Sequence, residues 1–263
     1  MAVAGKLLVV LSLITWMGGC ASIADTLFDF PSDDEEAVEE AAKAEPEIVL
    51  GGEMADMVEL YSKHLKELDY QWIAGQELMC PEAGDGCGIL HQIKGEASLE
   101  LAREGVNPEF NLGRAVAEFK QGIEMTKVWG ADENPLTPFD CHNGLCEALA
   151  GLQLYKQGDD AARLGREYLE AAETFADLYP GHPAAICHIS VAQTRDLQLA
   201  VENGNGVDRA DLCMRLDATL YLVERTIMFS DRSGEDYWPR YRDRFVQVQE
   251  ELTELKNTMN HCL

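Results

Sequence analysis

The chain has 263 residues, of which 47 are acidic and 21 basic, so its formal net charge at pH 7 is −26. A chain this acidic repels nucleic acid and anionic lipid headgroups, which makes both poor partners. Its apolar content of 46% is typical of a folded protein, and the roughly 240 residues after the N-terminal segment suffice for one sizeable domain or an array of small repeats.

The first 20 residues combine Lys6, a short apolar run from Leu7 to Met17, two glycines and Cys20. This pattern resembles a bacterial lipoprotein signal peptide spanning residues 1–19, and the resemblance implies cleavage before Cys20 and lipid on that cysteine. The run has about half of the roughly 20 apolar residues that a transmembrane helix needs. A plain secretory signal and a cytosolic protein are the alternatives. Since Ala21 rather than aspartate follows Cys20, we expect a lipid anchor in the outer membrane, facing the periplasm.

Residues 20–50 form an acidic segment that includes Asp33-Asp34-Glu35-Glu36 and Glu39-Glu40. Few large apolar side chains follow Phe30 in this segment, so ordering it would cost more entropy than burial returns. We expect a self-repelling, lipidated tether that holds a helical domain of residues 51–263 off the membrane.

Seven cysteines follow the lipidation residue, and an odd number in an oxidising compartment leaves at least one unpaired or bonded to another chain. Cys80 and Cys87 bracket a loop rich in proline and glycine, and Cys141 and Cys146 bracket the sequence His-Asn-Gly-Leu. Both spacings can close small loops at helix ends, so these four residues are disulfide candidates, although spacing alone does not prove the pairing.

Apolar residues recur three and four positions apart along almost the whole chain, as on one face of a helix. The expected helices or their apolar stripes cover residues 53–79, 90–101, 112–123, 145–152, 164–178, 183–201, 212–227 and 235–261. No run alternates with a period of two and is rich in β-branched and aromatic residues, which argues against a sheet. The sequence therefore predicts an all-α fold of antiparallel helical hairpins.

A faint internal repeat lies between Leu90 and Pro183. Its two copies share a glycine, an alanine and a phenylalanine at the same spacing: Gly95, Ala115 and Phe119, then Gly151, Ala171 and Phe175. These residues resemble tetratricopeptide repeats, in which the glycine lets helix A approach helix B, and the alanine and the aromatic residue pack from helix B. The spacing from glycine to alanine is longer here than in that family. The resemblance implies a tetratricopeptide-like solenoid, and an irregular helical bundle is the alternative.

Two clusters contain enough soft ligands for a zinc site: Cys141-His142 with Cys146, and Cys187-His188. Their spacing is not that of a Cys-x-x-Cys knuckle, and export favours disulfides over thiolate metal sites. We therefore expect no metal and no cofactor.

No nucleophile elbow, zinc-protease motif or phosphate-binding glycine loop occurs in the sequence, so we expect no catalytic residues. The histidines fit surface or helix-end positions. Three tryptophans, Trp72, Trp129 and Trp238, fit packing under a hairpin better than the lining of a ligand groove.

The last expected helix has apolar residues at alternating steps of three and four from Trp238 to Cys262. Such a heptad stripe either covers the preceding helix as an end cap or pairs with a second copy as a coiled coil. We favour the end cap and hence a monomer over a homodimer. Cys262, on the same stripe, is the candidate for a free or intermolecular thiol.

Together these features predict a membrane-tethered periplasmic lipoprotein that acts as a non-catalytic scaffold or adaptor for an envelope protein. The alternative is an accessory lipoprotein that binds small apolar or anionic ligands in an internal tunnel. That alternative rests on a resemblance to the T component associated with TRAP transporters, which also combines a lipid anchor with tetratricopeptide-like helices.

Overall fold

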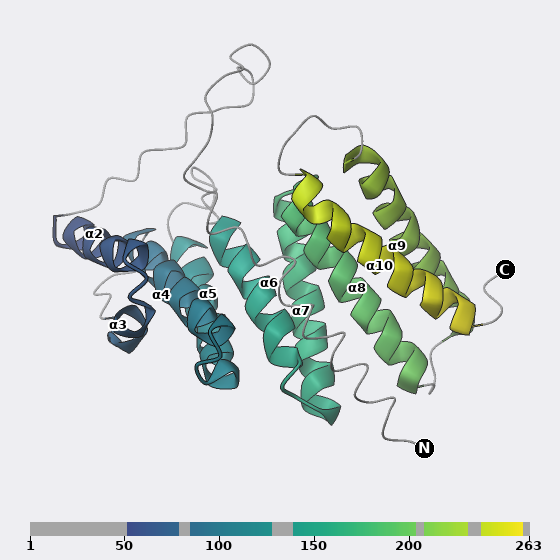
Figure 1. Cartoon of the computed structure of the whole chain (residues 1–263), viewed down its shortest axis with the longest axis horizontal. Helices are drawn as coiled ribbons and strands as arrows, with labels where there is room; N and C mark the ends of the chain where they lie inside the picture. Colours follow the sequence, from purple (N-terminus) through teal and green to yellow (C-terminus); the bar gives the residue numbers. More distant parts are fainter. Residues whose placement is uncertain (1–51, 79–84, 128–138, 204–207, 231–237, 260–263) are drawn as a thin grey trace, which may run out of the picture. The chain divides into compact units, whose positions relative to one another are not determined.

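A computed structural model of the chain describes residues 52–78, 85–127, 139–203, 208–230 and 238–259 (Figure 1). Every secondary-structure element within these ranges is an α-helix, and none of them contains a strand, which confirms the all-α prediction. The described residues divide into two compact units, with the boundary between Leu145 and Cys146. We call residues 52–145 the N-terminal unit and residues 146–259 the C-terminal unit.

The helices closely follow the predicted stripes. In the N-terminal unit they are α2 (Gly52–Lys66), α3 (Tyr70–Gly75), α4 (Asp85–Arg103) and α5 (Pro108–Lys127). The boundary between the units falls within α6 (Phe139–Gln153). In the C-terminal unit they are α7 (Gly158–Leu178), α8 (Pro183–Asn203), α9 (Arg209–Ser230) and α10 (Trp238–Thr258).

The centre of the N-terminal unit is an antiparallel pair formed by α4 and α5. Glycines on α4 let the two helices approach closely. A Cβ atom on Gly88 would lie 2.8 Å from Thr126, and one on Gly95 would lie 2.7 Å from the ring of Phe119. The Phe119 side chain is fully buried, and the missing side chain of Gly95 leaves the space that its ring occupies.

The single helix expected over residues 53–79 is in fact two helices, and that prediction was wrong. The chain turns at Leu68, whose φ of 59° is in the left-handed region. Asp69 then caps α3, since its carboxylate accepts a hydrogen bond from the backbone N–H of Trp72. Leu68 is consequently 67% exposed, although its spacing from Leu65 and Trp72 continues the apolar pattern of the predicted helix.

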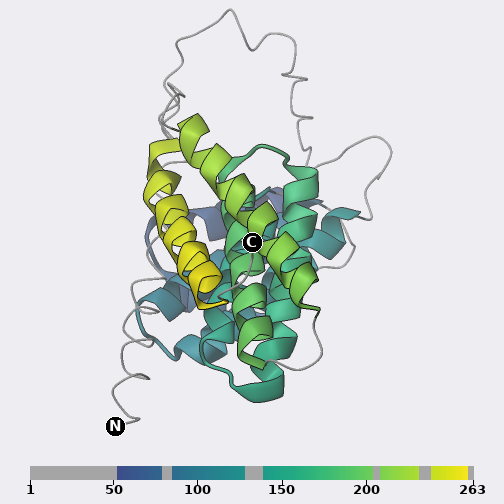
Figure 2. The same cartoon turned by 90° about the vertical axis from the view of Figure 1, so that its right-hand side faces the viewer.

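The C-terminal unit is built around α8, which packs against α7, α9 and α10. Figures 1 and 2 show α9 and α10 side by side. They run antiparallel, because Arg209 at the start of α9 donates to the backbone oxygen of Met259 just past the end of α10. Lys256 of α10 also reaches Asp217 of α9, with 2.7 Å between Nζ and Oδ1.

The predicted stripe on the last helix lies inside this unit. Tyr241, Phe245, Val248 and Leu252 are buried, and α10 packs against α8 and α9 of the same chain. The stripe is therefore covered as the end-cap alternative predicts. Trp238 begins α10, but its side chain and all of Cys262 lie outside what the structure describes.

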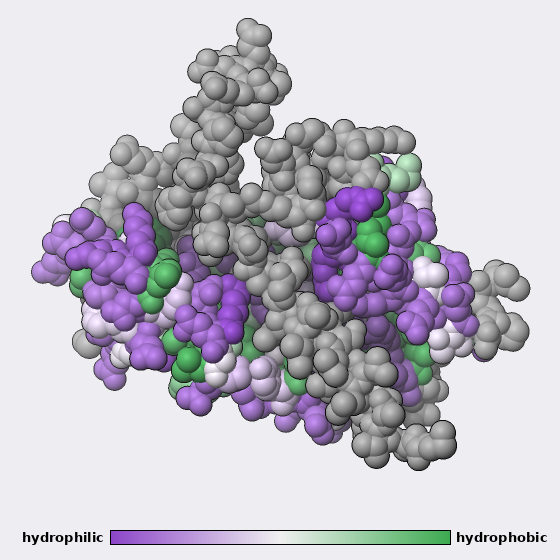
Figure 3. Space-filling view, in the orientation of Figure 1, coloured by the Kyte–Doolittle hydropathy of each residue, from purple (hydrophilic) through white to green (hydrophobic). Residues whose placement is uncertain are grey.

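Hydrophilic residues make up most of the coloured surface in Figure 3, and hydrophobic residues appear as separate patches. Within the described ranges, no helix is both long enough and apolar enough to span a bilayer.

Candidate functional site

The structure describes some of the cysteines in the sequence and not others. Cys20, Cys80 and Cys262 lie outside the described residues. Cys87, in α4, and Cys213, in α9, are both disulfide-bonded. The pairing of Cys80 with Cys87 stays a prediction.

The expected disulfide between Cys141 and Cys146 is wrong. Cys141 is a fully buried thiol, and both residues belong to α6 rather than to a loop. Five residues of α-helix separate two Cα atoms by about 7.5 Å along the axis alone. A disulfide needs Cα atoms within about 7 Å, so the helix itself forbids the bond. Burial, with the nearby Glu96 and Asp140 carboxyls adding to it, raises the pKa of the Cys141 thiol and keeps it protonated.

A buried ion network joins α4 to α5. Glu118 of α5 accepts from Lys94, 2.9 Å from Nζ, and lies 2.7 Å from Nδ1 of His91. These two contacts outweigh the burial of Glu118 and hold its pKa below the ordinary value. Burial and the Glu118 charge together raise the pKa of Tyr61 in α2. The two ion pairs of Glu118 join α4 to α5 across a largely buried interface, which indicates a structural role.

Two carboxyl groups share one amide between α4 and α6. The amide nitrogen of Gln92 lies 3.0 Å from Oε1 of Glu96 and 3.0 Å from Oδ2 of Asp140. Burial raises the pKa of both acids, and that of Glu96 reaches about 7, with Asp140 and Glu100 contributing. At neutral pH Glu96 is therefore protonated in about half of the molecules, whereas an exposed glutamate would be almost fully ionised.

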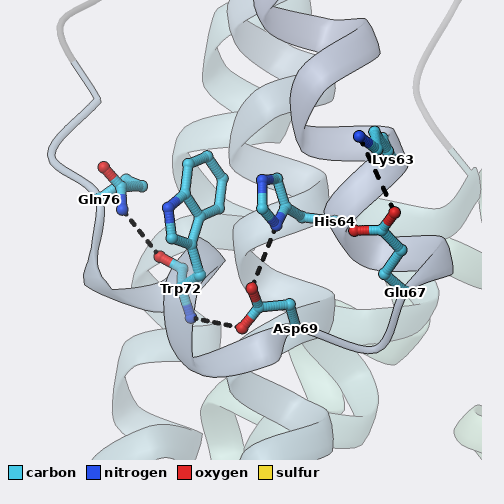
Figure 4. Close-up of polar contacts among 6 residues, drawn as sticks. All are labelled: Lys63, His64, Glu67, Asp69, Trp72 and Gln76. Carbon is cyan, nitrogen blue, oxygen red and sulfur yellow. Dashed lines mark hydrogen bonds and ion pairs between the residues drawn. The ribbon is translucent and has the colours of Figure 1, made fainter.

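An aromatic corner forms where α2 meets α3 (Figure 4). The imidazole of His64 stacks on the indole of Trp72, with ring centroids 3.7 Å apart and planes inclined by 12°. Nδ1 of His64 lies 3.2 Å from Oδ2 of Asp69, the residue that caps α3. Tyr61 packs edge-on against the same indole at 5.3 Å. Trp72 thus packs within its own hairpin, as the sequence favoured, whereas nothing in the sequence pattern linked it to His64.

The C-terminal unit contains a buried polar contact between α7 and α8. The hydroxyl of Tyr168 lies 3.1 Å from Nδ1 of His188, and the guanidinium of Arg195 stands 5.7 Å from the Tyr168 ring centroid. Arg195 also donates to the backbone oxygen of Ala150 at 3.1 Å. Burial, together with the positive charges of Arg244 and Arg195, lowers the pKa of His188 to about 3. His188 is therefore a neutral core residue, not the surface or helix-end histidine expected.

The outer face of α9 carries a line of large exposed apolar side chains. Met214, Tyr221 and Met228 are 68%, 60% and 53% exposed and lie seven residues apart, so they form one line along the helix. We call these three residues the outer stripe of α9. The stripe predicted over residues 212–227 is the inner face of this helix, on which Leu216 and Val223 are buried, and the heptad spacing of the three exposed residues is a separate signal that the prediction did not use.

A metal site is not evident in the part of the chain that the structure describes, since no three side chains of His, Cys, Asp or Glu gather there as ligands. Comparisons with protein-family models, with curated proteins and with solved structures give no match.

Proposed function

We propose that the protein is a lipid-anchored scaffold, held by Cys20 in the outer membrane on the periplasmic side, that binds another envelope protein without catalysing a reaction. The observation that carries this proposal is the outer stripe of α9. Large apolar side chains aligned on one exposed helix face are a feature of protein interaction sites rather than of an ordinary acidic surface.

The arrangement of α4 and α5 supports a tetratricopeptide-like architecture. Gly95 lies directly against Phe119, which is the contact between helix A and helix B that the resemblance requires. Each unit contains antiparallel helix pairs, and stacked pairs of this kind offer extended faces to a peptide or protein.

The groups with the largest pKa shifts support a non-catalytic role. Cys141 and His188 are 0% and 2% exposed and lie between packed helices, where no substrate reaches them. Perturbed groups of this kind also arise from structural burial, and here each has a neighbouring helix that accounts for its shift.

Photo-crosslinking in native cells tests the proposal. A photoreactive residue replacing Tyr221 should yield a defined adduct with one envelope protein, whereas the same residue replacing Phe110, which is 67% exposed on α5, should not. Adducts that are absent, or identical at both positions, would refute the scaffold. A co-purified small ligand without a protein adduct would instead favour the ligand-binding alternative.

The anchor is tested separately. Replacing Cys20 with alanine should release the chain from the membrane fraction and leave its helical circular dichroism unchanged. Recovery of the unchanged protein in the inner membrane would contradict the proposed location.

A further inference from the structure

We propose that the outer stripe of α9 binds an amphipathic α-helix of another protein, with apolar residues at heptad spacing and a row of lysines or arginines along one edge. The inference rests on the proposed scaffold function and names the chemistry of its partner.

The length and spacing of the stripe fit a helix. Seven residues of α-helix advance about 10.5 Å, so Met214, Tyr221 and Met228 present three apolar contacts over about 21 Å. A partner helix that repeats its apolar residues every seven positions meets all three at once. Methionine adapts its shape to the groups it contacts, and tyrosine adds a large apolar ring with a polar end, both of which suit a docking face.

The charges beside the stripe determine which helix fits. Asp217 and Glu224 each follow a stripe residue by three positions, so they lie along the same edge of α9. The Asp217 side chain remains 54% exposed even while it bonds to Lys256, and Glu224 is exposed. On the opposite edge, Arg225 lies over the ring of Tyr221, 5.7 Å from its centroid. A basic edge on the partner therefore faces Asp217 and Glu224, which is the pairing that flanking charges specify between packed helices.

A second copy of this chain fits the stripe less well. In an antiparallel pair centred on Tyr221, Glu224 of one chain faces Asp217 of the other, so like charges meet on both sides of the axis. Two chains that each carry a net charge of −26 also repel at long range, and the same charge opposes docking on anionic lipid. A basic helix is attracted by both the local edge and the overall charge.

The test uses the full chain in detergent and three synthetic helical peptides in a fluorescence anisotropy titration. The first peptide has leucines at heptad spacing and lysines along one edge, the second has glutamates along that edge, and the third has the composition of the first in scrambled order. We expect the first to bind about fivefold more tightly than the second, as two exposed ion pairs would give. The scrambled peptide should bind more weakly than the first, because non-specific attraction alone remains.

Matched variants assign the binding to α9. Replacing Met214, Tyr221 and Met228 with serine should abolish the preference for the first peptide over the scrambled one, whereas Phe110→Ser should leave it unchanged. The double variant Asp217→Lys and Glu224→Lys should reverse the preference between the lysine-edged and glutamate-edged peptides.

Equal binding of the first and scrambled peptides, or no effect of the serine variant, overturns the inference. Concentration-dependent dimerisation lost in the serine variant overturns it in favour of a second copy, and vesicle binding lost in that variant overturns it in favour of lipid. A photo-adduct at Tyr221 without peptide preference refutes this inference alone. Peptide preference without an adduct in cells refutes the scaffold function instead.

Discussion

Replacing Gly144 with alanine should destabilise the N-terminal unit. The ring of Phe119 lies against two glycines, Gly95 of α4 and Gly144 of α6. A Cβ atom on Gly144 would lie 2.2 Å from the end of the ring, and Gly95 also lies close to the ring, since a Cβ there would lie 2.7 Å away. The ring is fully buried, so it can relieve the clash only by pushing helices apart.

The size of the effect follows from two opposing terms. Overpacking a well-filled core costs about 1–3 kcal/mol, and placing alanine instead of glycine inside a helix returns about 1 kcal/mol. Because the clash is with a fully buried ring that both α4 and α6 contact closely, we expect the upper part of that range and a net loss of about 1–2 kcal/mol. Gly113 of α5 is the matched control, since its Cβ would meet no atom within 4 Å. Gly113→Ala should therefore stabilise the protein by up to about 1 kcal/mol.

Guanidinium denaturation followed by circular dichroism measures both variants. A second change, Phe119→Leu in the Gly144→Ala background, should recover part of the loss because the smaller side chain leaves room for the new methyl group. If the Gly144→Ala variant is as stable as the Gly113→Ala variant, the result would contradict the close contact between Gly144 of α6 and the ring of Phe119.

Three further predictions concern protons and thiols. The unfolded chain protonates His188 near its ordinary pKa of 6.5, but the folded unit does so only near pH 3, so stability should fall as pH falls through this window, and less steeply in His188→Gln. Glu96 acts in the opposite direction: its folded pKa of about 7 exceeds the ordinary 4.5, so stability should fall as pH rises from 4.5 to 7, and Glu96→Gln should flatten this slope. Denaturant midpoints at several pH values check both. Cys141 should be alkylated in the unreduced, unfolded protein, and mass spectrometry finding it bonded to Cys146 would contradict the helical assignment of α6.

The sequence predicted the inner helix faces well because burial and helical period act together there. Leu90, Ile93, Ala97 and Leu101 were assigned to one face of a helix from spacing alone, and all four are buried on α4. Apolar residues at this spacing indicate an amphipathic helix with one face packed against a core.

The failures occur where a local contact overrides the period. Leu68 continues the apolar spacing of α2, but the chain turns there and Asp69 caps α3, well before residue 79, where the pattern placed the end of the helix. The spacing of Cys141 and Cys146 predicted a small closed loop at a helix end, yet both lie within α6, and Gly144 between them packs against Phe119. In both cases the structure depends on a contact between two particular residues, and the spacing of apolar residues does not predict such a contact.

The outer stripe of α9 escaped notice for a further reason, which concerns the inner face of that helix. Thr219 and Thr226 lie among its buried positions, where their hydroxyls donate to the carbonyls of Arg215 and Leu222, 2.9 and 2.8 Å away. These bonds satisfy the hydroxyls within the helix, so a polar residue can be buried at little cost. The inner face of α9 is consequently less apolar than a core face usually is, while its outer face carries methionine and tyrosine. The difference in hydrophobicity between the two helix faces, on which sequence patterns depend, is therefore small in the helix that carries the outer stripe.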